Sequence, residues 1–145
     1  MKKLICMLAF IASLMCACTN PRVERAHRLI DEYQQKAEIA NQELNKMISN
    51  GICLTDEQEA YIIADAKVWA TKTMIVVGEN WSLEMAPLRF EAAMLAVKAE
   101  ELKVPLSPEQ KAYAHKFNEV SMYLGTVSVL EKWLELNSPT SLRAE

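Results

Sequence analysis

From Pro21 onward, the chain repeats apolar residues at the spacing of an α-helix in four successive segments. Apolar side chains that recur every three or four residues share one face of a helix. No stretch sustains the strict alternation of apolar and polar residues that predicts a half-buried strand. Only three glycines occur in 145 residues. The sequence therefore predicts an all-α fold.

The first segment begins at Pro21, carries a heptad seam and ends at the turn signal Asn50-Gly51. The seam residues are Val23, Ala26, Ile30, Tyr33, Ala37, Ala40, Leu44 and Met47. The residues expected to widen this face are Leu29, Ile39 and Ile48. A helix of about 28 residues spans roughly 42 Å, so an extended stalk is an alternative to packing along its whole length.

The second segment starts with a capping box in which Gln58 reaches back to the cap residue Thr55, and it runs to about Val77. Gly78 is its expected terminator. Its apolar face is so broad that we expect the most buried helix here. The residues of this face are Ile63, Ala66, Ala70, Met74 and Val77, broadened by Ile62, Trp69 and Val76.

The third segment is expected to run from about Leu83 to Lys103, with Pro87 in its first turn. Its face consists of Leu88, Ala92, Leu95, Ala99 and Leu102. The fourth opens at Ser107 with a second capping box, and Gly125 inside it indicates a close contact with another helix. Its seam is Tyr113, Phe117, Val120, Leu124, Val127 and Leu134, flanked by Tyr123, Leu130 and Trp133.

Short connections between these segments favour an antiparallel four-helix bundle. Residues 54–61 (LTDEQEAY) and 106–113 (LSPEQKAY) are similar, and the likeness continues over 54–81 and 106–133. Such a repeat is typical of two duplicated helical hairpins. The apolar faces disagree, however, because His115 and Asn118 stand where the first copy has Ile63 and Ala66. Duplication and convergence on one kind of helix cap both remain open.

The first residues have the pattern of an export signal. Lys2 and Lys3 precede an apolar run from Leu4 to Met15, and small and polar residues follow. A run of twelve residues is too short for the roughly 30 Å core of a bilayer, which needs about 20 residues in a helix. The segment therefore predicts a signal peptide rather than a transmembrane helix.

The residues Met15-Cys16-Ala17-Cys18 resemble the lipobox of bacterial lipoprotein precursors. The resemblance implies that residues 1–17 are a cleaved signal peptide and that residues 18–145 form one helical domain. It also implies lipid on Cys18, whose several acyl chains give stable anchoring. Thr19 and Asn20 in the sorting positions imply the periplasmic face of the outer membrane. The alternative is an ordinary secretory signal and a soluble periplasmic protein.

Cleavage before Cys18 leaves Cys53 as the one remaining thiol, so no disulfide framework is expected. Cys53 is expected to be a small buried apolar residue, with an intermolecular disulfide as the alternative. The chain has 16 basic and 19 acidic residues, and loss of Lys2 and Lys3 leaves 14 against 19, a net charge of −5. An acidic surface does not favour nucleic acid as a partner.

The sequence shows no pattern of catalytic or metal-binding residues. His27 and His115 lie on different segments without ligands at suitable spacing, and both are expected to be exposed. No enzymatic activity, metal or cofactor beyond the covalent lipid is therefore expected. In the irregular loop GENWSLEMAP, Trp81 and Met85 either attach the loop to the bundle or form an interface.

These observations favour a non-enzymatic module that binds another envelope protein. Small helical lipoproteins of this kind resemble accessory or piloting subunits of envelope machines, and exclusion or immunity factors. Carriage of a small apolar ligand within the bundle is one alternative. A self-associating stalk built on the seam at 23–47 is the other.

Overall fold

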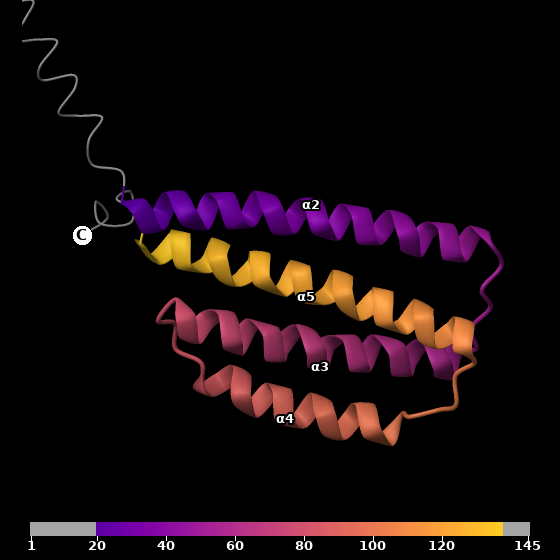
Figure 1. Ribbon diagram of the computed structural model, residues 1–145. Coiled ribbons are helices and arrows are strands. Elements are labelled where there is room, and N and C mark those ends of the chain that lie inside the picture. The colour runs from indigo at the N-terminus through magenta and orange to yellow at the C-terminus, as the bar shows by residue number, and fades with distance from the viewer. Residues whose placement is uncertain (1–19, 138–145) are drawn as a thin grey trace, which may run out of the picture.

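The computed structural model describes residues 20–137, which form four α-helices and contain no strand (Figure 1). The all-helical class is thus confirmed for this part of the chain. The helices are α2 (Pro21–Ser49), α3 (Asp56–Asn80), α4 (Ala86–Glu101) and α5 (Pro108–Asn137).

The helices lie side by side in the spatial order α2, α5, α3, α4, which makes an open helical bundle (Figure 1). Among these four, α2 contacts α5, α5 contacts α3, and α3 contacts α4, while no other pair is in contact. The antiparallel order expected for neighbours is not confirmed. The consecutive helices α2 and α3 are separated by α5, and α3 and α5 run in the same direction (Figure 1).

Two apolar clusters hold the row together. The larger contains Trp81 and Trp133 with residues of α2 and α5, and the smaller joins α3 to α4. The buried members of the larger cluster are Ala26, Ile30, Trp81, Val127, Leu130, Trp133 and Leu134. Those of the smaller are Ala64, Val68 and Ala99. Each end of the row therefore has a core of its own.

The predicted seam of α2 is confirmed, because all eight of its residues are buried or half-buried. The predicted face of α4 is confirmed in the same way. The predicted apolar faces were wrong at six positions, which are exposed: the widening residues Ile39 and Ile48 on α2, the face residue Ile63 and the widening residues Trp69 and Val76 on α3, and the seam residue Leu124 on α5. The helices α3 and α5 have neighbours on two sides only, so apolar residues on their remaining sides stay in contact with solvent.

Both predicted capping boxes are present, and the structure joins them to each other. The side chains of Gln58 and Gln110 donate to one another over 3.1 and 3.0 Å. Gln58 also donates to the carbonyl oxygen of Pro105 at 3.0 Å, and Gln110 donates to that of Cys53 at 2.8 Å. Gln110 comes 52 residues after Gln58, and Pro105 comes 52 residues after Cys53. The two similar stretches therefore make the same hydrogen bonds to each other in both directions.

Candidate interaction surface

The helix α4 has apolar residues on two opposite sides. One side packs against α3 and includes the buried residues Ala92 and Ala99. The other side carries Phe90, Met94 and Val97, which are 72%, 56% and 57% exposed. We call these three residues, with the exposed Ala86 and Ala93, the α4 stripe.

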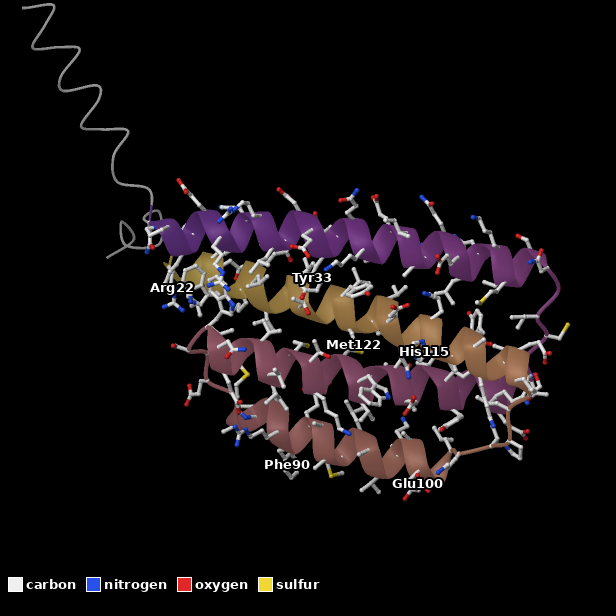
Figure 2. The ribbon with its side chains drawn as sticks, in the orientation of Figure 1. Arg22, Tyr33, Phe90, Glu100, His115 and Met122 are labelled. Atoms are coloured by element: carbon white, nitrogen blue, oxygen red, sulfur yellow. The ribbon has the colours of Figure 1, made fainter. Side chains whose placement is uncertain are left out.

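The spacing of the α4 stripe makes it continuous. Steps of four and three residues from Phe90 through Met94 to Val97 bring the three side chains onto one face of a helix. Figure 2 shows Phe90 pointing away from the bundle, on the side of α4 opposite to α3. Scattered exposed apolar residues are ordinary on protein surfaces, whereas a contiguous patch is typical of a binding site.

The helix at the other end of the row, α2, has a polar outer side. The side of α2 turned away from α5 is polar, and Ile39 is the one large apolar residue exposed in its middle turns. The exposed polar residues of this side include Arg28, Asp31, Gln35, Glu38, Gln42 and Lys46. Exposed apolar surface is therefore not a general property of the edge helices, and the α4 stripe needs its own explanation.

Charged side chains border the α4 stripe. Arg89, Glu91, Lys98 and Glu100 are all exposed. Arg89 forms an ion pair with Glu79 of α3, and Glu100 lies 3.4 Å from Lys103. An apolar centre with a charged rim is the usual composition of a protein–protein interface.

A network of charged residues connects α2 to α5 away from the stripe. The Lys116 ammonium lies 2.8 Å from the Glu43 carboxylate and 2.5 Å from that of Glu119, which also accepts from the Tyr123 hydroxyl at 3.2 Å. The hydrogen bond from Lys116 lowers the pKa of Glu119, and the bonds to Glu119 and Glu43 raise the pKa of Lys116. Burial, followed by the charge of Glu119, raises the pKa of Tyr123. Complete internal pairing indicates a structural network.

The structure places Trp81 and Met85 inside the bundle, each only 8% exposed. Trp81 packs edge-to-face on Trp133 at 4.7 Å, and the Arg22 guanidinium lies over both rings at 5.4 and 5.5 Å. Met85 packs against Gly78, where an added Cβ would collide with the Met85 methyl carbon. Burial favours their role in attaching the loop and leaves little side chain for the interface considered at these positions.

Sequence reasoning missed the α4 stripe, although its signal was present. Phe90, Met94 and Val97 have helical spacing. In a four-helix bundle, however, each helix is expected to bury a single apolar face, so a second apolar face on the same helix was not predicted. Only the place of α4 at the end of the row shows that this second face is uncovered.

The remaining expected residues divide into three groups. Cys18 lies outside the described residues, so its lipid attachment stays a prediction. Cys53 is exposed in the loop between α2 and α3, which corrects the expectation of burial. His27 and His115 are exposed on different helices. Over residues 20–137 there is no group of three or more histidine, cysteine or acidic side chains placed to hold a metal ion.

Within the same range, none of the helices has both the length and the apolar character required to cross a membrane. Comparison of the chain with models of protein families, with curated proteins and with solved structures finds no match. The α4 stripe and the pattern of residues 1–20 are therefore the two features of the chain that bear on its function.

Proposed function

We propose that the protein is a lipid-anchored, non-enzymatic protein–protein interaction module of the bacterial envelope, and that the α4 stripe is its contact surface. In this proposal residues 1–17 are the cleaved signal, and Cys18 attaches residues 18–145 to the periplasmic face of the outer membrane. The observation that supports it is the row of large apolar side chains at Phe90, Met94 and Val97, turned away from the fold.

The size of the stripe suits a modest interaction. Full burial of one large apolar side chain stabilises by roughly 1.5–3 kcal/mol, so covering the exposed parts of these three contributes about 3–5 kcal/mol. Loss of translational and rotational freedom on association offsets several kcal/mol of this gain. The charged rim and confinement at a membrane must therefore add to the affinity. Such an interaction suits an accessory or piloting subunit, or an exclusion or immunity factor.

The anchor and the bundle are close together in the sequence. The first helix begins at Pro21, three residues after Cys18. A chain of three residues spans at most about 11 Å, so an anchored Cys18 would hold the bundle at the membrane surface. If the signal is an ordinary secretory one, the same module would be soluble in the periplasm.

Site-specific photo-cross-linking of the full chain in cells tests the contact surface. A photoreactive phenylalanine analogue in place of Phe90 should give a discrete protein adduct. The same analogue in place of Ile39, an exposed apolar residue on the polar side of α2, is the matched control and should give little. Equal cross-linking at the two positions, or none at Phe90, would contradict the proposal.

A further inference from the structure

We propose that the α4 stripe binds the α4 stripe of a second copy of this chain, with the two helices antiparallel about a twofold axis. This inference names the partner of the proposed contact surface and so rests on the proposed function. It does not use the seam at 23–47, which faces α5 within the chain.

The helix α4 is apolar on two opposite sides. A helix with an apolar stripe on each of two opposite sides buries both stripes only when it has a neighbour on each side. Among the described helices α4 contacts only α3. A second α4 on its outer side would give the helix the second neighbour that its composition indicates.

The charged residues beside the stripe also fit a second copy of the helix. Glu91 and Lys98 are seven residues apart, which at about 100° per residue is 20° short of two turns, so they share one flank. Arg89 and Glu100 are eleven residues apart, about 20° more than three turns, and share the other flank. On the first flank the acidic Glu91 comes before the basic Lys98, and on the second flank the basic Arg89 comes before the acidic Glu100.

Both charge pairs are centred between Met94 and Leu95. A twofold axis at this point, perpendicular to the helix, places Glu91 opposite Lys98 of the second copy and Arg89 opposite its Glu100. Each contact occurs twice by symmetry, which gives four pairs of opposite charge. The apolar stripe from Phe90 to Val97 is centred within one residue of the same point, so both features specify one register.

A parallel arrangement matches the charges less closely. A twofold axis along the helices brings the first flank of one copy against the second flank of the other, so Glu91 faces Arg89 and Lys98 faces Glu100, each two residues or about 3 Å out of level. The antiparallel pair aligns its four charge pairs at the same height, and exchange of Glu91 and Lys98 separates the two arrangements because it would place like charges together in a parallel pair.

The ion pairs that the rim residues form within the chain do not prevent them from pairing with a second copy. Arg89 and Glu79 are largely exposed, as are Glu100 and Lys103. Exposed pairs contribute little to protein stability, so the same side chains exchange partners readily. In the dimer these charges set register and specificity, while the stripe supplies most of the affinity.

The contact area predicts a weak dimer. One helix-to-helix contact buries less than the roughly 1,200–2,000 Å² of a standard interface. Attachment of both copies to one membrane would raise their effective concentration. The twofold axis places the two α2 N-termini at opposite ends of the dimer, so with both anchors in one membrane the helices would lie along its surface.

Cysteine cross-linking of the full chain in the envelope tests the pair. Met94→Cys in a Cys53→Ser background, treated with a short bismaleimide, should give a product of twice the chain mass. The Cys53→Ser parent and an Ile39→Cys variant are the controls, and both should give at least tenfold less of it. Cys53 is removed because its exposed thiol would react.

Charge reversal then tests the register. In the Met94→Cys chain, Lys98→Glu should lower the dimer yield at least fivefold, because it places a second carboxylate opposite Glu91. The double change Glu91→Lys with Lys98→Glu restores opposite charges and should return the yield to within twofold of the parent. All these residues are exposed, so the thermal midpoint should stay unchanged and shows that the variants are folded.

The outcomes separate the two proposals. A Met94→Cys adduct with a different protein would overturn self-pairing and leave the proposed function standing. No adduct with any protein, at Met94→Cys or with the photoreactive analogue in place of Phe90, would overturn both. A dimer that the double charge reversal does not restore would overturn the antiparallel register.

Discussion

Lys116 lies between carboxylates of two helices, Glu43 on α2 and Glu119 on α5. Its side chain is 22% exposed, whereas that of Lys132, which pairs with Glu135 at the same three-residue spacing on α5, is 62% exposed. The two pairs differ mainly in exposure and in the contact to a second helix. They therefore form a matched set for measuring what this network contributes.

We expect Lys116→Met to lower the free energy of unfolding by about 1–2 kcal/mol, because it leaves two acidic side chains without their shared cation. Lys132→Met should change it by less than about 0.5 kcal/mol, since exposed pairs contribute little. Urea unfolding followed by circular dichroism measures both. Equal effects would show that the network contributes no more than a surface pair.

The lowered pKa of Glu119 predicts a pH dependence with a definite sign. A carboxyl whose pKa is lower in the folded chain binds fewer protons there than when unfolded, so stability rises with pH. Its contribution is complete above the ordinary pKa of 4.5 and is lost as the pH falls through the folded-state value. Unfolding free energies measured down to about pH 3 should fall less steeply in Glu119→Gln; identical slopes would contradict this assignment.

At the scale of the helices, Gly125 lies where the backbones of α5 and α3 approach closely. A Cβ there would lie 3.1 Å from the carbonyl oxygen of Ala70 and 3.3 Å from Cγ of Met74. The sequence prediction of a close helix contact is therefore confirmed, and the partner is α3. Gly78 is also tightly packed, but its neighbour is the end of the flexible Met85 side chain.

Gly125→Ala should lower the free energy of unfolding by about 1 kcal/mol more than Gly78→Ala. Alanine gains up to about 1 kcal/mol of helix propensity over glycine in a helix interior. At Gly125 that gain is outweighed because the α3 backbone must move, whereas at Gly78 the sulfur and methyl carbon at the end of the Met85 side chain must turn aside. Chemical unfolding of both variants decides the order, and a more stable Gly125→Ala chain would contradict it.

The helix starts at capping signals were predictable because such signals are local, whereas α3 runs to Asn80 and does not end at the expected terminator Gly78. The cap residues Thr55 and Ser107 and the first-turn Pro87 act within a few residues of their own position. The inward faces of α2 and α4 were also predictable, since each has one neighbour and one seam. The faces of α3 and α5 were predictable only in part, because each helix has two neighbours and open sides between them, where Ile63, Trp69 and Leu124 are exposed.

For the molecule as a whole, the row of helices has two unlike ends. α2 presents a polar outer side, and α4 presents the α4 stripe. The sequence predicts charged residues on two flanks of α4. They form the rim of a candidate binding surface only because the apolar side between them is exposed. The candidate site was therefore only half visible before the fold was known.

The proposed anchor predicts the behaviour of the whole protein in the cell. Cys18→Ser should abolish metabolic labelling with palmitate and release the chain from the membrane fraction. Cys53→Ser is the matched control and should keep both label and location, because Cys53 lies after the first helix and outside the signal region. Labelled Cys18→Ser protein would refute the assignment.

Local sequence was enough to give the number of helices in residues 20–137, their caps and the seam of α2, because hydrogen bonding and apolar spacing act within a few turns. It also carries the signal-like pattern of residues 1–18. The order α2, α5, α3, α4 depends on contacts between segments up to about a hundred residues apart, whose relative energies no local pattern contains. That order buries Trp81 and Met85, joins Gln58 to Gln110, and leaves the α4 stripe uncovered.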